Sequence, residues 1–205
     1  MPIGTFCKGF AFVVAVALTS IPAAVHAQLQ TQVLELSANE FTHDCDLLNV
    51  TPGVRTVYVR LFFNIGSTAV RFRVVPGPNV TLSYLSETHM YPMTLGDSQS
   101  GISVCFGECL VGDAVVAAIS YMSYGTGSNC GLLLLAPHPE AETVEILDCD
   151  GAPRAAWLLD INVNHNTPCG CSPLRIVSGT PHAFGCAALS LQASTWGAIK
   201  ALYRN

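Results

Sequence analysis

The sequence predicts an all-β protein built as an antiparallel β-sandwich. After residue 27, apolar and polar residues alternate along most of the chain, which is the pattern of half-buried strands. Turns rich in glycine, proline and asparagine separate these stretches at intervals of about 8–12 residues, as is typical of sandwiches and barrels. Helical periodicity is missing until the last residues, which argues against a fold of alternating strands and helices.

The strand pattern is expected at residues 32–36, 54–63, 69–75, 79–85, 102–106, 114–121, 131–135, 143–147, 156–163 and 174–177. The alternation is clearest at 69–75, where Val70, Phe72 and Val74 face one way. Turn-forming residues at 64–67 predict that 54–63 and 69–75 form a hairpin. Four arginines on these two strands are expected to share a solvated sheet face: Arg55, Arg60, Arg71 and Arg73.

The first 27 residues have the three parts of a secretory signal peptide. Lys8 makes the start positive, residues 10–18 form a short apolar helical core, and residues 24–27 end in a small-residue cleavage site. Retention as a membrane anchor is the alternative, but the strongly apolar part has nine residues and a spanning helix needs about 20. We therefore expect a secreted or envelope-associated protein with no membrane span after cleavage.

The composition narrows the choice of partners. Charged residues are 11% of the chain, and the formal net charge of −5 becomes −6 when Lys8 leaves with the signal peptide. Lys200 is then the only lysine, whereas binding to phosphate groups needs clustered lysine and arginine. We therefore expect no nucleic-acid partner.

Cleavage removes Cys7 and leaves eight cysteines, an even number that predicts disulfides in an exported chain. The candidates are Cys45, Cys105, Cys109, Cys130, Cys149, Cys169, Cys171 and Cys186. Cys105 and Cys109 could close a tight loop, and Cys130 and Cys149 could join the two strands that they flank. Eight cysteines allow 105 pairings, so the connectivity stays open.

A metal site is the alternative use of the last cysteines. His165, Cys169 and Cys171 offer soft ligands, with His43 or Cys45 as a further ligand. The spacing lacks the C-x2-C pairs of zinc motifs, and an oxidising compartment favours disulfides. No metal ligand and no cofactor are therefore predicted.

Two other groups of residues could form chemical sites. Five acidic residues between 140 and 150 predict an acidic edge strand that resists pairing with other sheets. A calcium site that uses Asp148 and Asp150 is the alternative, and a glycosidase pair of carboxylates is a weaker one. Residues 96–101 resemble the turn of a serine nucleophile, but no helix follows them, so an ordinary loop is expected.

Aromatic residues supply the alternative of carbohydrate binding, because exposed rings can stack on sugars. Most rings in β-proteins pack instead in the core or across strands. The candidates are Tyr84, Tyr91, Tyr121, Tyr124 and Trp157.

The last residues predict a short amphipathic helix. Residues 194–204 place four apolar side chains near one face and two cations at its rim, namely Trp196, Ile199, Leu202 and Tyr203 with Lys200 and Arg204. Eleven residues are marginal as an isolated helix, so this segment needs a surface to lie on. We expect three parts in the chain: a signal peptide at 1–27, a disulfide-stabilised sandwich at 28–186, and a tether with a docking tag at 187–205.

The pattern W-G-x-I-K-x-L-Y-R at residues 196–204, together with the signal peptide and the cysteines, resembles a group of uncharacterised secreted bacterial proteins. At the level of fold, the β-domain resembles cohesin-like or carbohydrate-module-like sandwiches, through Thr51-Pro52-Gly53 before a long strand and the Cys105 and Cys109 pair. The resemblance implies export and a sorting or anchoring role for the tail, and it implies no reaction.

The sequence thus favours a non-enzymatic interaction module whose partner is a protein or glycan of the cell envelope. Its tail would dock to a secretion or surface component through the apolar face of residues 194–204. Carbohydrate binding by the sandwich is the alternative.

Overall fold

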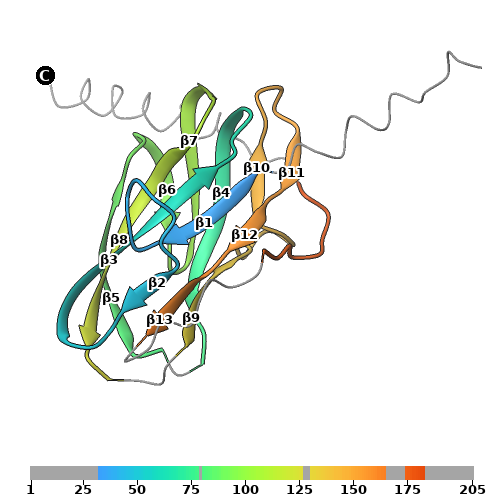
Figure 1. The fold of residues 1–205 in the computed structure, drawn as a ribbon. Helices are drawn as coiled ribbons and strands as arrows, with labels where there is room; N and C mark the ends of the chain where they lie inside the picture. The colour runs from blue at the N-terminus through green and yellow to red at the C-terminus, as the bar shows by residue number, and fades with distance from the viewer. Residues whose placement is uncertain (1–31, 79, 127–129, 165–173, 183–205) are drawn as a thin grey trace, which may run out of the picture. The chain divides into compact units, whose positions relative to one another are not determined.

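The alternating segments form thirteen strands and no helix in the part of the chain that the structure describes, residues 32–78, 80–126, 130–164 and 174–182 of a computed structural model (Figure 1). The expected signal peptide and C-terminal tag lie outside these residues, and so do Cys169, Cys171 and Cys186. Within the described residues, no helix is long and apolar enough to cross a membrane.

The strands form two sheets that pack face to face as a sandwich, so the predicted all-β sandwich is confirmed. The first sheet has the order β12-β1-β3-β8-β5. Its strands are β1 (Val33–Ser37), β3 (Pro52–Phe62), β5 (Leu82–His89), β8 (Ala114–Tyr124) and β12 (Trp157–Leu159). All pairs in this sheet are antiparallel except β1 with β12, which are parallel.

The second sheet has the order β11-β10-β4-β9-β13-β2, and β7 extends it by pairing with both β4 and β6. Its strands are β2 (Asp46–Leu48), β4 (Ser67–Pro76), β6 (Met93–Asp97), β7 (Gly101–Leu110), β9 (Gly131–Ala136), β10 (Glu145–Leu147), β11 (Pro153–Ala155) and β13 (Ile161–Asn164). Here only β2 and β13 run parallel.

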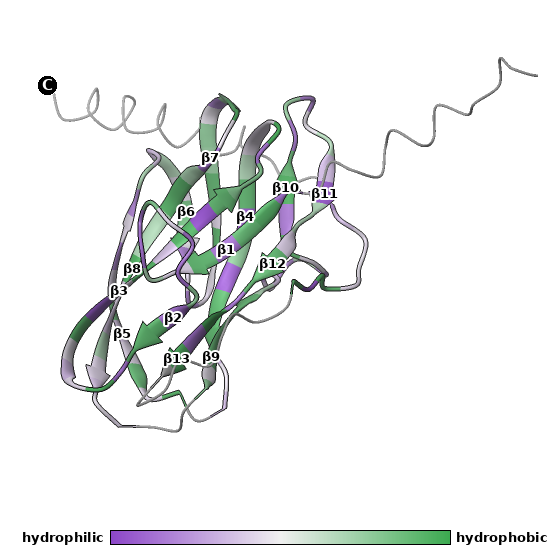
Figure 2. Cartoon of the chain, in the orientation of Figure 1, coloured by the Kyte–Doolittle hydropathy of each residue, from purple (hydrophilic) through white to green (hydrophobic). Residues whose placement is uncertain are grey.

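The core lies between the two sheets and is made by the inward-facing residues of each strand. Leu34 and Leu36 of β1 and Val57, Val59 and Leu61 of β3 are buried on the first sheet. Val70, Phe72 and Val74 of β4 are buried on the second, as their alternation predicts. The hydropathy colouring of Figure 2 shows the same alternation of apolar and polar residues along the strands.

The predicted hairpin of 54–63 with 69–75 is wrong. Both edges of β3 are occupied within the first sheet, by β1 and β8, and β4 belongs to the second sheet. Phe63 turns the chain with a positive φ of 53° and Gly66 continues the turn with a φ of 143°. The turn therefore carries the chain from one layer of the sandwich to the other.

The expected strand at 156–163 is two strands. β12 pairs with β1 in the first sheet, whereas β13 pairs with β9 and β2 in the second. Asp160 lies at the break, and its carboxylate is buried. The expected strand at 174–177 is reduced to one bridge, between Leu158 and Arg175. Three short strands lie outside all of the segments predicted from the sequence, namely β2, β6 and β11.

One disulfide joins Cys109, at the end of β7, to Cys149, just after β10, with 5.2 Å between the Cα atoms. Both specific pairings suggested by the sequence are therefore wrong. Residues 105–109 lie within an extended strand, where four residues span about 13 Å, and a disulfide bridges Cα atoms about 6 Å apart. Cys45, Cys105 and Cys130 are disulfide-bonded as well.

Candidate interaction surfaces

The outer surface of β3, β8 and β5 is open and carries no charged side chain at its described outward positions. The strand registers place side chains in rows across the three strands. The rows are Tyr58, Ala118 and Thr88, then Thr56, Ser120 and Ser86, then Val54, Met122 and Ser83, and finally Pro52 and Tyr124. We call this surface the uncharged face.

One end of the uncharged face is apolar. Val54 is 55% exposed and lies opposite the half-buried Met122, and Tyr124 is 52% exposed in the next row. The Tyr124 hydroxyl donates to Ser83 Oγ at 3.0 Å, which holds the ring near β5. Because these apolar side chains belong to adjacent cross-strand pairs, they form one continuous patch on the sheet as it stands.

The structure does not gather the five candidate rings for sugar binding on one surface. Tyr121 is 2% exposed, and burial raises its pKa to about 12. Tyr84 contacts the Tyr121 ring edge-on at 6.3 Å, and burial followed by the charges of Glu87 and Asp97 raises its pKa. Tyr91 packs on Phe106 with ring centroids 4.7 Å apart, and Trp157 belongs to β12 at the opposite edge of the sheet from β5. Tyr124 alone of the five lies on the uncharged face.

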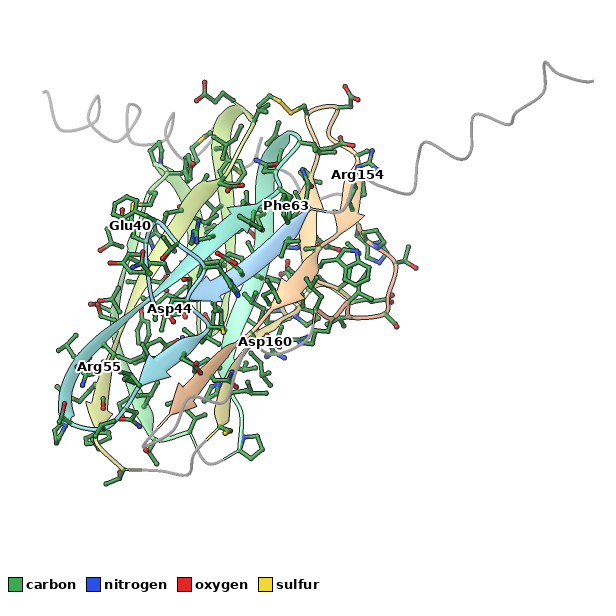
Figure 3. The ribbon with its side chains drawn as sticks, viewed as in Figure 1. Glu40, Asp44, Arg55, Phe63, Arg154 and Asp160 are labelled. Carbon is green, nitrogen blue, oxygen red and sulfur yellow. A yellow bond between two sulfur atoms is a disulfide. The ribbon has the colours of Figure 1, made fainter. Side chains whose placement is uncertain are left out.

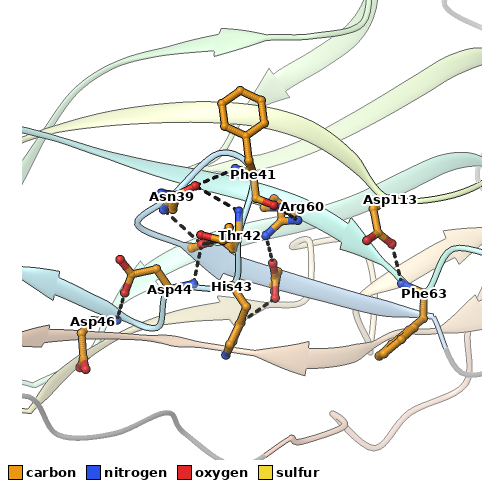
Figure 4. A network of polar contacts seen from close by, with 11 residues as sticks. Asn39, Phe41, Thr42, His43, Asp44, Asp46, Arg60, Phe63 and Asp113 are labelled. Atoms are coloured by element: carbon orange, nitrogen blue, oxygen red, sulfur yellow. Dashed lines mark hydrogen bonds and ion pairs between the residues drawn. The ribbon is translucent and has the colours of Figure 1, made fainter.

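The other half of the same sheet is covered by its own chain. Residues 38–44 fold back from the end of β1 over the outer surface of β1 and β3 (Figure 4). Beneath them, Glu35 Oε1 lies 2.7 Å from Arg60 Nη1, and Glu35 Oε2 lies 2.9 Å from His43 Nδ1. Glu35 is fully buried and Arg60 is 5% exposed. Partner surfaces cannot reach the sheet here.

Hydrogen bonds of one serine and one asparagine fix that covering loop. Ser37 Oγ donates to the Thr42 carbonyl at 2.9 Å and accepts the N–H of Asp44 at 3.0 Å. Asn39 Oδ1 accepts the N–H groups of Phe41 and Thr42. Short polar side chains that bond nearby backbone in this way are typical of ordered turns.

The acidic residues between 140 and 150 do not form an edge strand, so that prediction is wrong. β10 lies between β4 and β11, and Glu145 on it is fully buried. Arg71 binds the Glu145 carboxylate through Nε at 2.9 Å and Nη2 at 2.5 Å, and Glu140 lies 3.8 Å from Arg71 Nη1. The expected solvated arginine face is also wrong, because Arg60 and Arg71 are buried in different sheets.

Asp148, the main residue of the calcium alternative, is held by a cation of the protein. Arg154 Nη2 lies 2.7 Å from Asp148 Oδ2, and the N–H groups of Ala152 and Asp150 donate to Asp148 Oδ1. Burial acts to raise the pKa of Asp148, but these hydrogen bonds and the Arg154 charge together lower it. The described residues contain no group of three or more metal-binding side chains, and His43 binds Glu35.

Residues 96–101 close the hairpin of β6 and β7: β6 ends at Asp97, β7 begins at Gly101, and the expected loop is confirmed for residues 98–100. Asp97 Oδ1 accepts the N–H groups of Gln99 and Ser100, and hydrogen bonding from Ser100 lowers the Asp97 pKa. Ser98 is fully buried, and its N–H donates to the Glu87 carboxylate at 3.0 Å. Ser98 is thus closed to any substrate.

Sequence reasoning missed one buried polar cluster. Asp160 Oδ1 accepts the Leu135 N–H at 2.8 Å, and Arg175 binds both Asp160 oxygens, through Nε at 2.5 Å and Nη2 at 2.7 Å. Arg175 also donates to the Leu135 carbonyl. One indication of this cluster is visible in the sequence, where the aspartate Asp160 stands inside the apolar stretch 156–163.

No protein-family model and no curated protein matches the sequence. Solved structures with a similar arrangement include a non-cellulosomal cohesin from the archaeon Archaeoglobus fulgidus. Its sequence is 14% identical and its TM-score is 0.47, and the match covers 65% of this chain and 90% of that chain. Another is the sixth cohesin of scaffoldin B from Acetivibrio cellulolyticus, solved with a Cel5 dockerin, at 15% identity, TM-score 0.43, and 65% and 98% of the two chains. A third is the cohesin module of a family 33 glycoside hydrolase from Clostridium perfringens, at 9% identity, TM-score 0.43, and 65% and 98% of the two chains.

Proposed function

We propose that this protein is an exported, non-enzymatic interaction module that binds a protein partner of the cell envelope through its uncharged face. The observation that carries the proposal is the apolar patch of Val54, Met122 and Tyr124 on an open sheet surface without charges. Methionine and aromatic residues are enriched in protein interfaces, and charged residues are depleted at their centres.

The energetics of such a face favour association. Burying a charged side chain costs several kcal/mol of hydration free energy unless a well-placed charged partner compensates for that loss. The described outward rows of β3, β8 and β5 contain hydroxyl and apolar groups only, so a partner can cover them without this penalty. The contact cannot extend onto the other half of the sheet, because the loop of residues 38–44 covers the surface over Glu35.

The charged groups support a binding role rather than catalysis. Arg71 and Glu145, Arg154 and Asp148, and Arg175 and Asp160 are each engaged in an ion pair that joins two segments of the sandwich. A catalytic carboxylate must instead face a substrate cleft. These groups stabilise the scaffold that presents the face.

Export is supported by the predicted signal peptide and by the cysteines. The Cys109–Cys149 disulfide fits an oxidising compartment, where such bonds persist. We propose that residues 194–204 act as a second docking element, toward a secretion or surface component.

Affinity capture tests the proposal. The mature protein, starting at Gln28, is immobilised and exposed to a cell-envelope extract of the source organism, beside the variants Val54→Glu and Met122→Glu. We expect both variants to lose retained proteins at least tenfold. Leu95→Glu is the matched control, because Leu95 is 52% exposed on β6, away from the uncharged face. Equal capture by all four proteins refutes a role for the face.

Carbohydrate binding is a second candidate, favoured by the exposed Tyr124 ring and by a row of hydroxyl groups that lies two rows from it on the same face. Thr56, Ser120 and Ser86 form that row on the same face. An array of cell-wall and capsule glycans tests it with Tyr124→Ala as the matched variant. A signal that Tyr124→Ala abolishes favours the glycan, whereas protein capture that survives in Tyr124→Ala and fails in Val54→Glu favours the protein partner.

A further inference from the structure

Three turns lie at one end of the sandwich, and two of them present large apolar side chains to solvent. Phe63 is 65% exposed and Ile65 50% in the turn between β3 and β4, and Val111 is 69% exposed in the turn between β7 and β8. The third turn, between β10 and β11, is joined to the second by the Cys109–Cys149 disulfide, drawn in yellow in Figure 3. We call Phe63, Ile65 and Val111 the apolar end.

The apolar end is braced rather than loose. Gly112 N–H donates to the Asn64 carbonyl at 2.8 Å, and Asn64 Nδ2 donates to the Leu110 carbonyl at 2.8 Å. Asn64 is 4% exposed, and its Oδ1 accepts from Gln32 Nε2 at 2.9 Å. These bonds tie the first two turns together, so the backbone that carries the three apolar side chains is held in place.

The Phe63 backbone is held in a conformation that bulky residues avoid. Its φ is 53°, and its N–H donates to Asp113 Oδ1 at 3.0 Å. Strained backbone that displays a side chain is enriched at binding sites, because the surrounding structure must maintain it. The strain here displays a large aromatic ring in solvent instead of burying it.

Acidic groups surround the apolar end. Glu108 is exposed near the end of β7, and Asp113 and Asp150 are exposed in the turns that follow β7 and β10. The three turns contain no lysine or arginine, and Arg154 on β11 is bound to Asp148. The surface therefore combines an apolar centre with net negative charge, and the complementary occupant combines apolar side chains with cations.

One segment of this chain has that composition. Residues 194–204 contain Trp196, Ile199, Leu202 and Tyr203 together with Lys200 and Arg204, and contain no acidic residue. A segment this short gains a stable helical form chiefly by packing on a surface. Its sequence therefore matches the apolar end both in hydrophobicity and in sign of charge.

The chain is long enough to bring the two together. The N–H of His182, the last described residue, donates to Glu145 Oε1 at 2.7 Å. Glu145 precedes the disulfide cysteine Cys149 by four residues, so their Cα atoms lie at most about 14 Å apart. The eleven residues 183–193 span up to about 36 Å, so residues 194–204 reach the apolar end of the same molecule.

We propose that residues 194–204 dock on the apolar end of their own chain, with Lys200 and Arg204 against Glu108, Asp113 and Asp150. While it is docked, the segment is not accessible to other proteins, so an envelope component that binds it must first displace it from the sandwich. The inference rests on the proposed function only in treating this segment as a docking element, and it does not involve the uncharged face.

Photo-crosslinking of the full mature chain tests the proposal. Phe63 is replaced by p-benzoylphenylalanine, which keeps an aromatic ring at the site, and the irradiated protein is digested and analysed by mass spectrometry. We expect a crosslink within the monomer to the tryptic peptides 176–200 or 201–204. The same probe at Leu95 is the control and should not reach these peptides. A crosslink found only in dimers, or none from Phe63, overturns the proposal.

A second measurement reports on docking without the photoprobe. Trp157→Phe leaves Trp196 as the single tryptophan, and its emission should shift to the red in K200E/R204E, and again in Val111→Ser. Added salt should produce the same shift, because exposed charge pairs are screened. Emission that none of these changes alters contradicts the proposal. Val54→Glu should leave the crosslink intact, so failure of the binding face and failure of docking are distinguishable.

Discussion

Glu35 and Arg60 lie directly opposite each other on β1 and β3, and their side chains form a 2.7 Å ion pair on the outer surface of the sheet. The pair is buried although it points away from the core, because residues 38–44 cover it. The loop thus turns half of an exposed sheet surface into an interior and leaves the uncharged face as the open half.

Removing one partner of that pair should destabilise the protein strongly. Glu35→Gln leaves the buried Arg60 guanidinium without its carboxylate, and we expect a loss of about 3 kcal/mol in the free energy of unfolding. Denaturant unfolding at neutral pH measures it. Arg55→Gln is the matched control, since Arg55 bonds only to exposed backbone and Thr51 in the described contacts, and should cost less than about 1 kcal/mol. A small effect of Glu35→Gln would show that water reaches Arg60.

The Cys109–Cys149 disulfide should contribute substantially to stability. It closes a loop over a sequence separation of 40 residues, for which the chain-entropy relation gives about 4 kcal/mol. The double variant C109S/C149S should unfold at correspondingly lower denaturant concentration. Peptide mapping without reduction should find the two cysteines linked in the wild-type protein. A map that links Cys109 to Cys105 instead would contradict the observed fold of β7.

Asp148 should make stability depend on acid pH. Its folded pKa lies below its ordinary value, so the stabilisation is present above that ordinary value, 3.8, and is lost as the pH falls through the folded pKa. Asp148→Asn keeps an oxygen acceptor for the Ala152 N–H but loses the charge that binds Arg154. We expect the variant to be about 1 kcal/mol less stable at pH 7. The difference should shrink as the pH falls below 3.8 and through the folded pKa, and a difference that stays constant over this acid range would exclude the ionised carboxylate as its source.

Asp160 should control whether the segment 174–182 stays on the sandwich. Asp160→Ala leaves the Leu135 N–H without its acceptor and removes the partner of Arg175, at an expected cost of about 3 kcal/mol. Hydrogen exchange should accelerate at the Arg175 N–H, which donates to the Leu158 carbonyl at 3.1 Å. Leu174→Ala, at a 50% exposed site beside it, is the control and should leave exchange unchanged. Unaltered protection in Asp160→Ala would place the anchor of this segment elsewhere.

Strand positions were predictable because the signal is local. The burial of Val70, Phe72 and Val74 follows from period-two alternation, which one strand displays whatever its neighbours are. The boundary at Asp160 was not predictable in this way. A run of apolar residues reads as one strand, and only the placement of β1 and β9 in different layers requires the chain to leave one sheet and join the other.

The candidate sites show the same division. Tyr121 and Tyr124 are equivalent as aromatic residues in the sequence, yet one is buried in the core and the other is exposed on the uncharged face. Their separation by three positions puts them on opposite surfaces of β8, and a covering sheet lies over only one of these. The signal peptide and the role of residues 194–204 stay predictions.

Local patterns are sufficient to identify the chain as an all-β protein with apolar inner faces, because alternation and turn chemistry act over a few neighbouring residues. The pairing of Cys109 with Cys149 and the burial of Glu35 and Glu145 with arginines are visible only in the folded chain. The same is true of the open half of the first sheet. These relationships join residues far apart in the chain, and their energies depend on which strands become neighbours, which no local pattern encodes.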